Sequence, residues 1–176
     1  MKTRLNLLLA PLAVAAAITC LTLPAAKADY VQTDAIVTLW AGQNLDAGTV
    51  TIGHDTSFVY VTYNTTGGWE LVQTHLDVEN SLEAIPQTGS GNPKPGKFAY
   101  SHSHPDGTTS YTYAVPIPYG SMLGSELALT IAAHAVVQQD NANGKVIQTQ
   151  TGWADGLPFP GNNWATYVSI FIPLGG

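Results

Sequence analysis

LALTIAAHAVV, residues 127–137, is the stretch that decides the fold, because it is apolar at both odd and even positions. The odd-numbered positions carry the larger apolar side chains, and the even-numbered positions carry smaller ones together with His134. Successive residues of a strand point to opposite faces of the sheet, so this pattern predicts a central strand that is covered on both sides. We therefore expect a β fold with this segment in its core.

Eight further segments have the composition of strands. Val, Ile, Thr and Tyr dominate them, and Gly, Pro, Asn and Asp separate them at the spacing of roughly 8 to 12 residues that is typical of sandwiches and barrels. We predict an all-β fold, an antiparallel β-sandwich of jelly-roll or immunoglobulin-like type with about nine strands. The predicted strands are residues 35–40, 49–53, 58–63, 69–78, 98–101, 111–117, 127–137, 146–151 and 164–172.

KFAYSHSHPDGTTSYTYAVPIP, residues 97–118, predicts a β-hairpin. Aromatic and apolar residues alternate along both arms, 98–101 and 111–117. The Pro-Asp-Gly sequence at 105–107 between them is typical of a tight turn. We expect the two arms to pair, with a site at the bend.

Residues 1–28 predict a signal peptide. Lys2 and Arg4 form a basic start, an apolar run extends to residue 23, and Ala-Lys-Ala at 26–28 matches the pattern that a signal peptidase cuts. The remaining residues, 29–176, suit a single β-sandwich domain. We expect a secreted, extracellular protein, or a periplasmic one in a bacterium, with no transmembrane segment after cleavage.

Charge and cysteine content exclude several functions for the chain after residue 28. All 12 acidic residues follow that point but only 6 − 3 = 3 of the basic ones do, so the net charge is 3 − 12 = −9. So few cations cannot neutralise phosphates, which argues against nucleic acid and anionic membranes as partners. The single cysteine, Cys20, lies in the predicted signal peptide, so disulfides and thiolate sites are excluded as well.

Six motifs resemble a secreted bacterial β-sandwich domain of unknown function that recurs in exported proteins. The resemblance covers most of the chain after residue 28 and implies a stand-alone extracellular β-domain, but it transfers no catalytic residue. The motifs are, in order, THLDV (74–78), IPQTGSGNPKPGKFAYS (85–101), YAVPIP (113–118), LTIAAHAVV (129–137), GWADG (152–156) and FPGNNWATY (159–167).

Histidines form the strongest candidate site. His75 and Asp77 are two residues apart, as are His102 and His104, and on extended backbone each pair projects to one side. His134 of the central strand would complete a set of five ligands. Imidazole and carboxylate without sulfur suit zinc or copper(II). The competing interpretation is that these are solvated or core histidines.

Calcium is a second candidate ion. The sequence Asp-Asn-Ala-Asn-Gly at 140–144 offers oxygen donors in a turn, and Asp106 and Asp155 lie in other predicted loops. The spacing does not complete an EF-hand loop.

Aromatic residues suggest a binding surface. Trp69 and Trp153 lie beside glycine-rich turns, and Tyr111 and Tyr113 lie on a predicted strand. Exposed aromatic rings stack on sugar rings, so these four residues are candidates for glycan binding, with core packing as the alternative.

Both predicted terminal strands offer a route to self-assembly. If residues 30–40 or 164–172 form an edge of the sheet, that edge invites pairing with a neighbouring copy.

No catalytic motif accompanies these features, since neither GxSxG nor HExxH occurs. We therefore predict a secreted, non-catalytic β-sandwich protein for extracellular binding, to a glycan or cell-surface component, or for surface or matrix structure. The alternative is a metal-binding protein or metal-dependent enzyme that uses the histidine cluster.

Overall fold

The computed structural model describes residues 31–117, 126–141 and 143–173. The predicted signal peptide, residues 1–28, lies outside the described residues. Within the described part of the chain, no helix has the length and apolar character needed to span a membrane.

The described chain consists of strands with two short 3₁₀ helices and no α-helix, which confirms the all-β prediction. Each of the nine predicted strands is present, and the two-residue β9 is an addition. The elements are β1 (Gln32–Ala41), β2 (Leu45–His54), β3 (Phe58–Thr65), β4 (Trp69–Glu79), η1 (Leu82–Ala84), η2 (Pro95–Lys97), β5 (Tyr100–Ser103), β6 (Ser110–Pro116), β7 (Glu126–Asp140), β8 (Val146–Ala154), β9 (Leu157–Pro158) and β10 (Thr166–Pro173).

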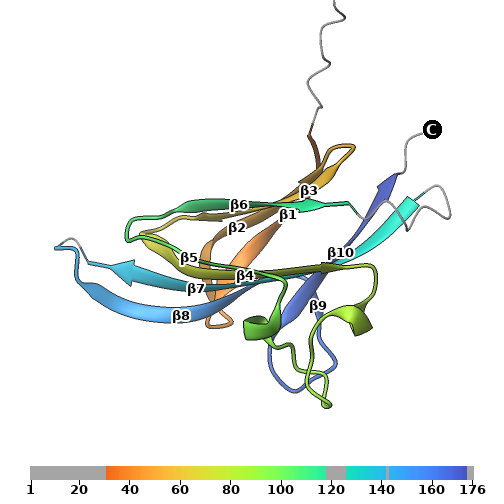
Figure 1. Ribbon diagram of the computed structural model, residues 1–176. Coiled ribbons are helices and arrows are strands. Elements are labelled where there is room, and N and C mark those ends of the chain that lie inside the picture. Colours follow the sequence, from red (N-terminus) through yellow and green to blue (C-terminus); the bar gives the residue numbers. More distant parts are fainter. Residues whose placement is uncertain (1–30, 118–125, 142, 174–176) are drawn as a thin grey trace, which may run out of the picture.

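All the strands belong to one antiparallel sheet that curls into a half-barrel (Figure 1). The strand order is β5-β4-β7-β8-β1-β2-β3-β6, with β10 beside β7 and β9 beside β10. A sandwich of two separate sheets is not confirmed, because β8 and β1 join the two halves. That junction is short, since only residues 39–41 of β1 pair with residues 152–154 of β8.

The predicted hairpin at residues 97–118 is wrong. β5 pairs with β4 and β6 pairs with β3, so the two arms lie at opposite ends of the strand order. The loop between them bonds to other strands: the backbone N–H of His104 donates to Val72 in β4, and the backbone carbonyl of Thr109 accepts from Thr65 in β3. Alternation predicts a strand but not its partner, which is why the arms were recognised and their pairing was not.

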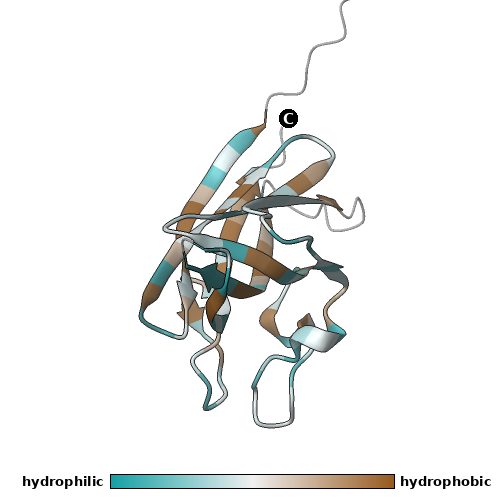
Figure 2. Ribbon diagram, turned by 90° about the vertical axis from the view of Figure 1, so that its left-hand side faces the viewer, coloured by the Kyte–Doolittle hydropathy of each residue, from teal (hydrophilic) through white to brown (hydrophobic). Residues whose placement is uncertain are grey.

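The prediction of a doubly covered central strand is confirmed in β7. All residues from 129 to 135 are buried, so both faces of the strand are covered, and its two edges pair with β4 and with β8 and β10. Its larger residues, such as Ile131, face the main core inside the half-barrel, and we call this side of the sheet the inner face. Hydrophobic and hydrophilic residues alternate along the strands accordingly (Figure 2).

A second, smaller core lies on the outer face of β7 and β8. It is built where residues 80–99 and 157–165 fold back over the sheet. Its buried members are Ile85, Phe98, Ala132, Trp153, Phe159 and Ala165.

Candidate functional site

The five predicted metal ligands are divided between the two faces of the sheet. His102 and His104 contact residues of the inner face, whereas His75 and His134 lie on the outer face. The structure therefore brings the histidines together as two pairs and not as one cluster. In the described residues, no group of three or more His, Cys, Asp or Glu side chains is placed to hold a metal ion.

The inner pair lies where the free edges of β5 and β6 approach each other. The His102 ring stacks on Tyr111 with centroids 4.7 Å apart and planes at 6°, and His104 meets the same tyrosine at 4.7 Å. Thr74 Oγ1 lies 2.9 Å from His104 Nε2 and 2.8 Å from the Tyr113 hydroxyl. We call this contact between the two edges the seam. Side chains, rather than backbone hydrogen bonds, join the edges there.

The outer pair consists of His75 and His134, which face each other across β4 and β7. Their ring centroids lie 5.4 Å apart, and the Nδ1 atoms of both are buried without a hydrogen-bond partner. Trp153 packs against His134 at 4.8 Å. Burial, reinforced by the neighbouring His75, lowers the pKa of His134 to about 3, and burial also lowers the pKa of His75. Both rings are therefore neutral at physiological pH.

Asp77 is buried next to this pair, at 2% exposure. Its Oδ2 accepts a hydrogen bond from the backbone N–H of Ala99, at 3.3 Å. Burial raises the pKa of this carboxyl group, and the bond from Ala99 opposes the rise. Asp77 thus anchors the segment that covers the outer face.

In the predicted calcium loop, Asp140 Oδ1 is buried without a hydrogen-bond partner, whereas the side-chain oxygen of Asn141 already has partners within the loop. Asn141 Oδ1 accepts from the backbone N–H groups of Asn143 and Lys145, at 2.9 and 3.1 Å. Residue 142 lies outside the described residues. The other two candidates lie in separate loops, since Asp106 follows β5 and Asp155 follows β8.

Three of the four predicted glycan-binding aromatics belong to the core. Trp69, Tyr113 and Trp153 expose only 4%, 7% and 5% of their surface. Tyr111 is half-buried, with His102 stacked on its ring. These four residues do not form an exposed row.

Both segments predicted to be edges keep an open side. β1 pairs with β2 along its length but meets β8 only at residues 39–41, and β10 pairs with β7 and, at its start, with the short β9. In the described chain, the first part of β1 and most of β10 thus have one edge without a hydrogen-bonded strand.

A row of polar residues that the sequence analysis did not single out lies on the outer face of β2, β3 and β6. In register across the three strands, Thr51 is opposite Thr62, which is opposite Thr112. One row further on, Thr49 is opposite Asn64, which is opposite Ser110. We call these six residues, with Phe58 and Tyr60 at the start of β3, the threonine face.

The side chains of the threonine face are accessible and ordered. All are half-buried or exposed. Thr62 and Thr112 bond through their hydroxyls at 2.9 Å, and the Ser110 hydroxyl donates to Asn64 Oδ1 at 2.7 Å. Cross-strand bonds of this kind fix the orientation of the polar groups.

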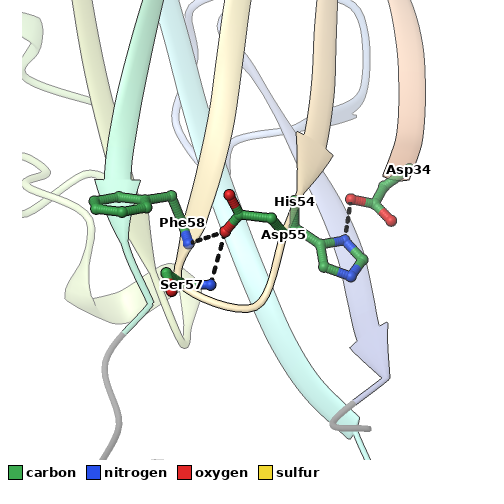
Figure 3. Close-up of polar contacts among 5 residues, drawn as sticks. All are labelled: Asp34, His54, Asp55, Ser57 and Phe58. Carbon is green, nitrogen blue, oxygen red and sulfur yellow. Dashed lines mark hydrogen bonds and ion pairs between the residues drawn. The ribbon is translucent and has the colours of Figure 1, made fainter. Parts of the chain in front are cut away.

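Asp55 holds the aromatic end of the threonine face in place. Its carboxylate accepts the backbone N–H groups of Ser57 and Phe58, both at 2.7 Å, in the turn before β3 (Figure 3). The Tyr60 hydroxyl donates to the other carboxylate oxygen at 2.6 Å. These bonds, that from Tyr60 above all, lower the pKa of Asp55. The ring of Tyr60 lies 6.1 Å from that of Phe58.

Asp34 and His54 form a buried pair that the sequence analysis missed. Asp34 Oδ2 lies 2.7 Å from His54 Nδ1, and both side chains are at most 10% exposed (Figure 3). Asp34 occupies a register shift of β1, between Thr33 and Ala35, and such bulges redirect side chains. The pair ties the start of β1 to the end of β2. No sequence signal reveals it, because the two residues are 20 positions apart and a bulge is invisible to alternation.

Comparison with known proteins does not assign the chain to a family. No family model matches the chain, and neither a curated protein nor a solved structure matches it. The function must therefore be argued from the geometry.

Proposed function

We propose that this chain is a secreted, non-catalytic domain that binds an extracellular polysaccharide through the threonine face. The observation that carries the proposal is the register of hydroxyl and amide groups across β2, β3 and β6, next to two partly exposed aromatic rings. The fold serves as a rigid support, and the ligand lies along the outside of the sheet.

The chemistry of the face suits a sugar polymer. Hydroxyls both donate and accept hydrogen bonds, as sugar hydroxyls do. Neighbouring strands are roughly 4.8 Å apart and alternate residues along a strand roughly 6.7 Å apart, so the rows repeat on the scale of a sugar ring. The Tyr60 and Phe58 rings add apolar surface for stacking.

Preorganisation favours binding at this face. Asp55 fixes Tyr60, and the bonds of Thr62 to Thr112 and of Asn64 to Ser110 restrict four polar side chains before any ligand arrives. Less side-chain entropy is then lost on binding. The strongly acidic composition gives no reason to expect an anionic polymer, so a neutral polysaccharide is the preferred ligand class.

Co-sedimentation of the purified protein with insoluble cellulose, chitin and bacterial cell walls tests the proposal. We expect the wild-type protein to sediment with at least one polymer. The variant Thr51→Val/Thr62→Val should reduce the bound fraction at least fivefold, because valine keeps the shape and strand propensity but removes two hydroxyls.

The matched control is Thr149→Val, which makes the same chemical change at an exposed position of β8 away from the threonine face. It should bind like the wild type. Failure to sediment with any polymer, or equal binding by the control and the double variant, would contradict the proposal.

Self-assembly is the second candidate function, and the open edges of β1 and β10 favour it. Ile36 on β1 and Phe171 on β10 expose 65% and 64% of their surface. An open edge with apolar residues nearby invites pairing with another copy. Size-exclusion chromatography with light scattering tests this candidate, since a monomer at high concentration would exclude it.

A further inference from the structure

The outer histidine pair has the features of a metal site, although only two of the five predicted ligands belong to it. His134 is 93% buried, since its exposure is 7%, and its Nδ1 has no partner. His75 Nδ1 is likewise buried and without a partner, and the two rings face each other from paired positions on β4 and β7. Two buried ring nitrogens without partners, on rings that lie next to each other, call for a third group that satisfies them, such as a cation.

The segment that covers His75 offers its ring a hydrogen-bond acceptor. The backbone of Pro95 opposes the lowering of the His75 pKa by burial, and because proline has no N–H it can only accept. Donation from Nε2–H to this carbonyl would leave the lone pair of His75 on Nδ1, the ring nitrogen that has no partner. A histidine that donates its other ring N–H to a carbonyl is the usual arrangement of a metal ligand.

The distance between the two rings is compatible with one ion bound by both. A metal roughly 2.0 Å from an imidazole nitrogen lies roughly 3.2 Å from the ring centroid. With centroids 5.4 Å apart, and with both Nδ1 atoms directed at the same ion, the angle between the two metal–nitrogen bonds would be roughly 115°, between trigonal and tetrahedral values.

We propose that His75 and His134 bind a first-row transition-metal ion beneath the segment that contains Pro95, with copper(II) bound more tightly than zinc. Both ligands are nitrogen, and copper(II) has the highest affinity for such sites among the divalent ions. Both imidazoles are neutral at physiological pH, as ligation requires. The site lies on the opposite side of the sheet from the seam and is independent of polysaccharide binding.

Calorimetric titration of the purified protein with Cu²⁺ and Zn²⁺ tests the proposal. We expect one ion per chain, with Cu²⁺ bound at least tenfold more tightly. His75→Gln should weaken binding at least tenfold, whereas the control His102→Gln, at the seam, should leave it unchanged. Circular dichroism verifies that each variant is folded.

The fluorescence of Trp153 can show whether the ion binds at His134, because the two rings lie 4.8 Å apart. Cu²⁺ should quench the fluorescence of the wild type, and Trp153→Phe should remove most of this response. The proposal is overturned if no ion binds stoichiometrically, or if His102→Gln loses binding while His75→Gln keeps it. A water molecule would then be the occupant between the two lone pairs.

Discussion

His134 makes the stability of the metal-free protein dependent on pH. Its pKa in the folded protein is about 3, whereas an unfolded histidine titrates near 6.5. Between these values the unfolded chain binds a proton that the folded protein does not, so the free energy of unfolding decreases as pH falls through this window. The lowered pKa values of His75 and His104 act in the same direction, and the raised pKa of Asp77 opposes them.

Urea denaturation with a chelator present, at pH 7, 5 and 4, measures this effect. We expect the wild type to lose a few kcal/mol over this range and His134→Gln to lose clearly less. If the free energy of unfolding fell equally with pH in the two proteins, His134 would not be kept neutral by the fold.

Asp34 should stabilise the junction of β1 and β2 through His54. Asp34→Ala removes the acceptor of a 2.7 Å bond and leaves a buried ring nitrogen unpaired, which costs about 1–3 kcal/mol. Thermal melts at pH 7 measure the loss. The control is Asp155→Ala at an exposed loop position, which should change stability by no more than about 0.5 kcal/mol. Equal effects of the two substitutions would contradict the structural role of the pair.

At the seam, one fully buried threonine connects the edges of β5 and β6, so the stability of both edges should depend on it. Thr74→Val keeps the shape but removes the hydroxyl that contacts both His104 and Tyr113. We expect a loss of about 1–3 kcal/mol and faster amide hydrogen exchange in both β5 and β6. If Thr74→Val is as mild as Thr149→Val, the two edges are not coupled through this residue.

Strands could be predicted from the sequence far better than their partners. Two-sided apolarity located β7 at the centre of the sheet, and alternation located β5 and β6. The turn at 105–107 suggested that β5 and β6 pair, but its Gly107 N–H donates to Glu70 on β4 instead. Long-range contacts of this kind decide the topology, and local sequence does not contain them.

The division of the histidines follows from the same limitation. Spacing correctly implied that His102 and His104 lie together, since their rings are 4.9 Å apart. Which face each strand turns toward the core depends on the curl of the sheet, so the sequence could not separate the seam from the outer pair. The threonine face was missed because threonine on a strand is also the ordinary choice for a solvated sheet surface.

At the level of the whole molecule, residues 80–99 and 157–165 cover only one part of the outer face of the half-barrel. The covered part contains the smaller core and the outer histidine pair, whereas the threonine face, on β2, β3 and β6, consists of half-buried and exposed residues. Ion binding and ligand binding are thus assigned to different strands of the outer face, so removal of a metal by chelation should leave polysaccharide binding unchanged. Co-sedimentation with and without chelator measures this effect, and loss of binding in chelator would show that the two sites are coupled.

Hydroxyl-radical footprinting of the protein bound to a polysaccharide tests the central claim most directly. Phe58 and Tyr60 belong to the threonine face, and the exposed Phe171 on β10 serves as an internal reference. We predict that the bound polymer protects Phe58 and Tyr60 from oxidation and leaves Phe171 unchanged. Unaltered oxidation of Phe58 and Tyr60, with protection at the seam or on β10 instead, would contradict the assignment.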